Sequence, residues 1–365
     1  MSSDNEKTCY RQMIAAVRQK RDRLPVSSQI RLALPDLLLK ELRQRVDVTS
    51  AADLRYSPWP PLVGFMDHLP DTAIGELDGD LELVIRHGKR RKPNEVSQFL
   101  RAKTGDSRAW YGGLFDVWAK ATLVRQRVEV DLDVPLPNGR DTDIRVKVGD
   151  RHFRIEGTVI TQDDESRDVW DRFVKDKRAD PTKILMRPGP YDPHDAKGPG
   201  LYYNALRFYA KVYDKIAKKL DADKSQCADD EPNVLLVSFA GAGLRPNDPG
   251  WGWALDELFD DQPSIGGRLV PAEGLRDISL SAWVDFTASE LCRSGEITVE
   301  DYDSRMADYT RIMSAPRRLG GILVFRNCEL LGARVNYNAR QECRITHAEM
   351  AELERLLSRA ATYSV

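Results

Sequence analysis

Residues 141–161 read Asp-Thr-Asp-Ile-Arg-Val-Lys-Val-Gly-Asp-Arg-His-Phe-Arg-Ile-Glu-Gly-Thr-Val-Ile-Thr. Apolar and polar residues alternate on both sides of Gly149 and Asp150, which predicts a β-hairpin with its turn at these two residues. Side chains alternate between the two faces of a strand, so Asp143 lies on a polar face of the first strand and Glu156 on a polar face of the second. If these faces coincide, two carboxylates lie side by side among several cations. That arrangement suits a divalent metal held against a phosphate.

The composition sets broad limits on the class of protein. The chain has 365 residues, enough for one large domain or two ordinary ones. It is 31% charged and 41% hydrophobic, which is typical of a globular protein. The formal net charge is −2, so no overall positive field indicates a nucleic-acid partner. Contact with a polyanion would need a local basic patch.

Cysteine usage and hydropathy bear on the compartment. The five cysteines are odd in number and include no Cys-x-x-Cys pair. We therefore expect neither a disulfide framework nor a structural zinc site, and we expect a reducing compartment. The N-terminus lacks the apolar core of a signal peptide, and no run of about 18 apolar residues occurs. The expectation is a cytoplasmic protein with no membrane span.

The chain divides by pattern into an N-terminal helical accessory region, residues 1–93, and an α/β core with a C-terminal helix, residues 94–365. The first region shows helical spacing of apolar residues, and residues 81–85 suggest a short strand. The basic segment at residues 87–93 is predicted to be a solvated loop, with a phosphate-contacting patch as the alternative. The accessory region is a candidate for docking a protein partner. The oligomeric state stays open.

The core shows an ordered series of elements. Helices are predicted at residues 94–101, 109–126, 169–175, 204–220 and 253–259, and a helix opened by a capping box at Thr346 is predicted to run to residue 357. Strands are predicted at residues 128–134, in the hairpin, and at residues 233–240, 278–286 and 321–325. A helix, a meander of strands and a helical crossover to a buried strand predict an α/β fold.

This order resembles the PD-(D/E)XK, or restriction-endonuclease-like, superfamily. The resemblance spans about residues 95–345. It implies a central mixed β-sheet flanked by helices, the restriction-endonuclease-like core, after a mostly helical N-terminal extension. The matching pieces are Phe115-Asp116 on a helix, Asp143-Ile144 and Ile155-Glu156-Gly157-Thr158 on the hairpin, a lysine-rich helix containing Lys215, and the apolar strand at residues 234–239.

The resemblance also implies a chemistry, the hydrolysis of phosphodiester bonds with Mg²⁺ or Mn²⁺. Asp143 and Glu156 would be the strand carboxylates that hold the metal, and Asp116 would be the helix carboxylate, where the family usually carries Glu. The partner would be a nucleic acid, with DNA favoured, and the setting bacterial genome defence or mobile elements. Thr158 occupies the slot in which the family carries a lysine, so another cation must take that role. Lys215 is one candidate, and the others are Lys147, Arg154 and Lys211.

Other interpretations of the same residues stay open. The two strand carboxylates also fit surface positions paired with Arg145 and Arg154, and Asp116 with Lys120 fits an i, i+4 surface pair. The lysines of the predicted helix 204–220 also fit a solvated face. At the level of the protein, Thr158 favours a catalytically inactive member of the fold that serves as a nucleic-acid-binding or protein-interaction subunit. A third possibility is an unrelated α/β protein with a structural hairpin.

Overall fold

The computed structural model describes residues 3–55, 59–88, 90–102, 107–161, 212, 215–216, 225–240, 259 and 315–363. The helix predicted at residues 169–175 and the strand predicted at 278–286 lie outside these residues. So do Lys211, Lys218 and all of the helix predicted at 253–259 except Phe259. Within the described ranges, no helix has the length and apolar character needed to span a bilayer.

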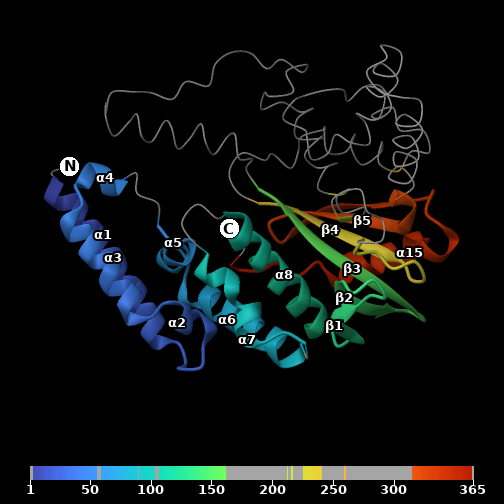
Figure 1. Cartoon of the computed structure of the whole chain (residues 1–365), viewed down its shortest axis with the longest axis horizontal. Coiled ribbons are helices and arrows are strands. Elements are labelled where there is room, and N and C mark those ends of the chain that lie inside the picture. Colours follow the sequence, from blue (N-terminus) through green and yellow to red (C-terminus); the bar gives the residue numbers. More distant parts are fainter. Residues whose placement is uncertain are drawn as a thin grey trace, which may run out of the picture.

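A six-stranded mixed sheet forms the centre of the fold, in the order β1-β2-β3-β4-β5-β6 (Figure 1). β1, β2 and β3 form an antiparallel meander, β4 lies parallel to β3, β5 lies parallel to β4, and β6 is antiparallel to β5. Helices flank this sheet, so the predicted α/β class with a mixed sheet is confirmed. The strands are β1 Val130–Pro135, β2 Asp141–Val148, β3 Arg151–Ile160, β4 Asn233–Phe239, β5 Leu319–Arg326 and β6 Glu329–Val335.

The predicted hairpin is formed by β2 and β3. Ile144 lies opposite Ile155, and Val146 lies opposite Phe153, so the apolar side chains of the two strands share one buried face. Gly149 adopts φ 60°, the left-handed conformation that a tight turn requires and glycine accepts without steric cost. β4 is buried along its whole length, as its unbroken apolar run predicts.

The N-terminal region is helical. Its helices are α1 Ser3–Arg23, α2 Gln29–Ala33, α3 Asp36–Val48, α4 Ala51–Arg55, α5 Pro61–His68, α6 Asp71–His87 and α7 Pro93–Val96. The strand predicted at residues 81–85 is wrong, because these residues lie inside α6. Ile74, Leu77, Leu81 and Val84 recur at helical spacing and are all buried, and this longer period outweighs a five-residue apolar run.

The core helices follow the predictions with one correction. α8 covers Ser107–Arg125, and α15 covers His347–Leu356 after the predicted capping box of Thr346 and Glu349. The helix predicted at residues 94–101 is broken at Ser97, whose hydroxyl donates to the Pro93 carbonyl, 2.9 Å away. Short 3-10 helices complete the fold, η1 Gln98–Arg101, η4 Ala315–Arg318 and η5 Gln341–Cys343.

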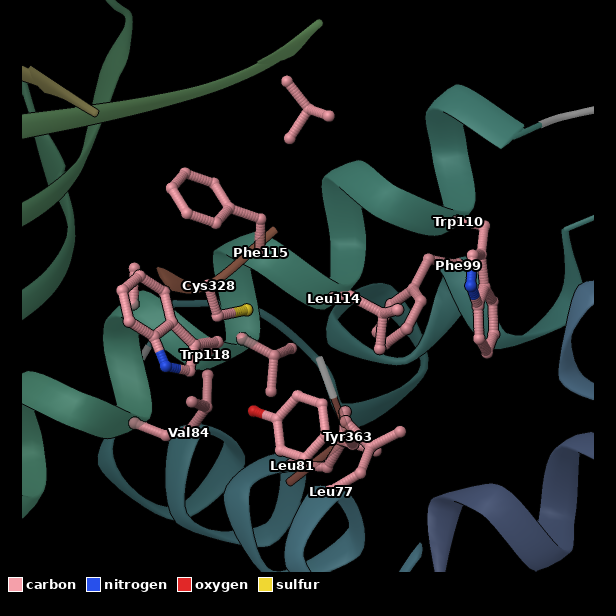
Figure 2. Close-up of a cluster of buried hydrophobic side chains, with 14 of the residues drawn as sticks. Leu77, Leu81, Val84, Phe99, Trp110, Leu114, Phe115, Trp118, Cys328 and Tyr363 are labelled. Atoms are coloured by element: carbon pink, nitrogen blue, oxygen red, sulfur yellow. The ribbon is translucent and has the colours of Figure 1, made fainter. Parts of the chain in front are cut away.

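α8 is the helix on which both halves of the chain pack. Figure 1 shows the N-terminal helices on one side of α8 and the sheet on the other. Trp118 of α8 lies against Phe325 of β5, with ring centroids 5.2 Å apart, and stacks on Phe115. Figure 2 shows Phe115 and Trp118 of α8 in the same cluster as Leu77, Leu81 and Val84 of α6. One buried cluster therefore joins α6, α8 and the sheet.

A buried carboxylate ties the C-terminal segment to the same helices. Asp80 of α6 has no exposed surface. Its Oδ1 accepts from Arg125 Nη2 of α8 at 2.6 Å, and its Oδ2 accepts from Arg359 Nη2 at 2.9 Å and from the Tyr363 hydroxyl at 2.8 Å. Charge-assisted hydrogen bonds of this kind offset the cost of burying the carboxylate.

Gly113 of α8 has a role in packing that can be tested. A methyl group at this position would overlap the ring and Cβ of Phe99, whereas one at Gly75 of α6 would meet no atom of the described residues within 4 Å. Gly113→Ala is therefore expected to lower the free energy of unfolding by about 1–3 kcal/mol through overpacking. Gly75→Ala is the matched control, expected to raise it by about 0.5–1 kcal/mol through helix propensity. Urea unfolding measures both, and a stabilised Gly113→Ala would contradict the packing.

Candidate active site

A cavity of about 230 Å³ opens between α8 and the β2–β3 hairpin. Four of the five site residues predicted from the sequence border it, namely Asp116, Asp143, Thr158 and Lys215. The fifth, Glu156, is buried beside them and interacts electrostatically with both Asp143 and Asp116. The structure thus brings together residues that are up to 99 positions apart in the chain (215 minus 116).

The cavity lies where the two hairpin strands stop pairing. The recorded register of β2 with β3 begins at Ile144 and Ile155. At Asp143, the residue of β2 just before Ile144, the contact with β3 is made by a side chain. The Asp143 Oδ2 accepts a hydrogen bond from the Gly157 amide at 2.9 Å. Burial disfavours the charge on Asp143, but Lys215, Lys120 and this amide outweigh it, so the pKa of Asp143 is lowered. Asp143 is therefore a fixed anion at the cavity wall.

Glu156 has the opposite electrostatic character. Its exposed fraction is 4%, and its Oε1 accepts from Gln226 Nε2 at 2.8 Å. Its buried Oε2 accepts no hydrogen bond from the described residues, and Lys215 Nζ lies 3.9 Å away. Burial, and then repulsion by Asp143, raise the pKa of Glu156 well above its usual range. Glu156 is thus a buried carboxyl group whose negative charge is disfavoured by its surroundings, with the Lys215 ammonium 3.9 Å from its Oε2.

The arginines next to the carboxylates belong to another ion pair. Arg145 Nε and Arg154 Nε donate to the Glu231 carboxylate at 2.9 Å and 2.7 Å. The alternative in which these arginines neutralise Asp143 and Glu156 is therefore wrong. Arg154 is also engaged away from the cavity, so it is a poor stand-in for the missing lysine. Lys215 lies on the cavity wall, and its Nζ is 3.3 Å from Gln226 Oε1.

A buried cation lies under Asp116. Lys120 has an exposed fraction of 1%, and its Nζ lies 2.9 Å from Asp116 Oδ1 and 2.9 Å from Asp133 Oδ1. The i, i+4 pair of Asp116 and Lys120 is therefore confirmed, but Lys120 is buried and not at the surface. Asp133 adopts φ 51°, which is uncommon for a residue with a side chain, and its carboxylate is buried against Lys120. Backbone strain of about 1–3 kcal/mol thus accompanies the ion pair that holds α8 on β1.

The basic segment at residues 87–93 is exposed at Arg90, Arg91 and Lys92, as predicted for a solvated loop, but its side chains also bind the sheet. Arg91 Nη2 lies 3.1 Å from the same Asp133 oxygen that contacts Lys120. Arg90 Nη1 donates to Asp141 Oδ1 at 2.6 Å, and the His87 ring lies 2.9 Å from the Val130 carbonyl oxygen. The segment therefore fastens the end of α6 to β1 and β2. It brings positive charge close to the acidic side of the cavity.

Several residues at this site escaped the sequence interpretation. No sequence pattern marks Asp133 or Gln226 as a site residue. The left-handed backbone of Asp133 and the contacts of Gln226 become visible only in the folded structure. Lys120 had a signal in its i, i+4 spacing from Asp116, but spacing does not reveal burial. Arg108, two turns before Asp116 on α8, borders the cavity as well.

The donor atoms fit a hard divalent cation held by two carboxylates. Mg²⁺ is usually held by one or two carboxylates together with water and substrate oxygens. Asp143 and the unused oxygen of Glu156 fit that demand, whereas Asp116 is engaged by Lys120. Within the described ranges, no group of three or more His, Cys, Asp or Glu side chains is arranged to hold a metal ion. The role of Asp116 as a metal ligand stays a prediction.

Comparisons with protein-family models, with curated proteins and with solved structures find no match to this chain.

The Lys120 ion pairs are expected to dominate the stability of this wall. Lys120→Met leaves two carboxylates without their buried cation, and the expected loss is about 3 kcal/mol in the free energy of unfolding. Arg91 still faces Asp133, which limits the loss. Lys147→Met is the control, because the Lys147 side chain is 40% exposed and its pair with Glu129 is expected to contribute about 0–1 kcal/mol. Urea unfolding that gives equal losses for the two variants would contradict this account.

Proposed function

We propose that this protein is a Mg²⁺- or Mn²⁺-dependent nuclease that hydrolyses phosphodiester bonds of DNA or RNA, built on a restriction-endonuclease-like core. One observation carries the proposal: Asp143, Glu156 and Lys215 converge at one end of a hairpin, beside a cavity. The order of elements around them supports it. A helix precedes three antiparallel strands, and a fourth strand follows parallel to the third.

In this proposal each residue has a definite task. Asp143 and Glu156 would hold the metal through their carboxylate oxygens, and binding of the cation would favour the charged form of Glu156. A bound Mg²⁺ supplies a Lewis acid for the phosphoryl oxygen and lowers the pKa of a coordinated water. Lys215 places positive charge where the phosphate gains negative charge. Thr158 offers a hydroxyl that orients the attacking water by a hydrogen bond.

A second candidate is a catalytically inactive protein of the same fold that binds nucleic acid or a protein partner. Two observations favour it. Thr158 has no charge, and Asp116 is held by Lys120 at 2.9 Å, so its carboxylate is engaged within the protein. In this case the cavity binds a phosphate group without hydrolysing it.

Substitution of the strand carboxylates tests the catalytic proposal. Asp143→Asn and Glu156→Gln keep the shape of each side chain and remove the charge that binds the metal. Each is expected to lower the cleavage rate of single- or double-stranded DNA or RNA in Mg²⁺ or Mn²⁺ by about 100-fold or more. Glu129→Gln is the control, because the Glu129 side chain is 60% exposed and lies outside the cavity. Cleavage that persists in both carboxylate variants and in a chelator would overturn the assignment.

A pair of substitutions tests whether Lys215 takes the role of the lysine that is absent at position 158. Lys215→Met is expected to lower kcat by about 100- to 1,000-fold, the usual effect of removing one charge stabiliser. Adding Thr158→Lys to that variant places an ammonium at the cavity wall and is expected to restore part of the rate. Lys147→Met, outside the cavity, should leave kcat unchanged. Full activity of Lys215→Met would show that a different group stabilises the charge.

A further inference from the structure

α8 contains two adjacent glycines that differ in their surroundings. A glycine within a helix destabilises it relative to alanine, so each position calls for a reason. At Gly113 the reason is the close approach of Phe99. At Gly112 a Cβ atom would meet no described atom within 4 Å, so packing supplies no reason. Gly112 instead borders the cavity, where the missing side chain leaves the backbone of α8 open to a ligand.

Arg108 lies one helical turn before Gly112 and faces the same way. It is exposed and borders the cavity, and it forms no ion pair with any residue in the described part of the chain. A guanidinium group presents a planar set of donors that matches phosphate oxygens in a bidentate manner. One turn beyond Gly112, Asp116 is already neutralised in part by Lys120. Lys120 therefore offsets part of the repulsion between Asp116 and an anion that approaches this wall.

We propose that the Arg108–Gly112 wall of α8 is the subsite for a backbone phosphate of the nucleic acid. Arg108 pairs with the phosphate oxygens, and the bare backbone at Gly112 lets the sugar–phosphate chain lie close against the helix. Lys215 borders the same cavity from the sheet side, so the phosphate lies between two cations. This inference deepens the proposed function and rests on it for the class of ligand.

Two substitutions on α8 test the subsite by blocking it and by removing its charge. Gly112→Leu fills the space with a good helix former, and Gly112→Ala fills part of it. Fluorescence anisotropy with labelled single-stranded and duplex oligonucleotides of DNA and of RNA, in Ca²⁺ to slow cleavage, should show about tenfold weaker binding for Gly112→Leu and a smaller loss for Gly112→Ala. Arg108→Ala should weaken binding and reduce the slope of log affinity against log salt by about 1.

Matched controls separate binding from folding. Gly75→Ala is the same helical substitution, at an exposed position with equally open space, and should leave binding unchanged. Arg43→Ala removes an exposed arginine of α3 and should leave the salt slope unchanged. Thermal unfolding should show Gly112→Ala at least as stable as the wild-type chain, because alanine favours the helix.

The outcomes distinguish this inference from the proposed function. Normal binding by Gly112→Leu and Arg108→Ala would overturn the subsite. The nuclease proposal would be unaffected, because the cleavage rates of Asp143→Asn and Glu156→Gln test it separately. A second outcome is a wild-type chain that binds the oligonucleotides without cleaving them, together with variants that lose this binding. It would support the subsite and overturn the nuclease proposal. A wild-type chain that binds none of the DNA and RNA oligonucleotides would overturn the subsite directly.

Discussion

The buried ammonium of Lys120 is the interaction on which the candidate site depends. A positive charge with 1% exposure is tolerated only when carboxylates surround it, and Asp116 and Asp133 do so from two different elements. Asp133 reaches Lys120 through a left-handed backbone conformation within β1. The ion pairs therefore fix the position of α8 relative to β1 and, through the sheet, relative to the hairpin. The cavity is the space left between α8 and the hairpin once that position is set.

The two strand carboxylates differ because their environments differ. The Asp143 carboxylate accepts a backbone hydrogen bond and lies near two lysines, which together lower its pKa. Glu156 is more deeply buried and faces the charge of Asp143, which raises its pKa. Pairs of titratable groups with pKa values driven apart are characteristic of sites that move protons or bind ions. Arg145 and Arg154, which alternate with these carboxylates along the hairpin, bind Glu231.

Apolar periodicity, unbroken apolar runs and capping signals predicted much of the fold because they arise from local geometry. The hairpin, α8, β4 and the capping box of α15 all follow from patterns within one element. β6 was missed because only part of it faces the core and its alternation is weak. The carboxylate pair and Lys215 could be predicted from the resemblance. Lys120 and Asp133 could not be assigned, because burial and a positive φ are consequences of tertiary packing.

The position of α8 explains why the N-terminal region matters to the site. One side of α8 packs on the sheet and forms the cavity wall, and its other side packs on α6 within one continuous buried cluster. Asp80 binds Arg125 of α8 and two residues of the C-terminal segment, so a second polar junction holds the same helix. A helix held on both sides forms a rigid wall, and rigid elements place functional groups more precisely than loops. Arg108, Gly112 and Asp116 therefore owe their placement as much to the N-terminal helices as to the sheet.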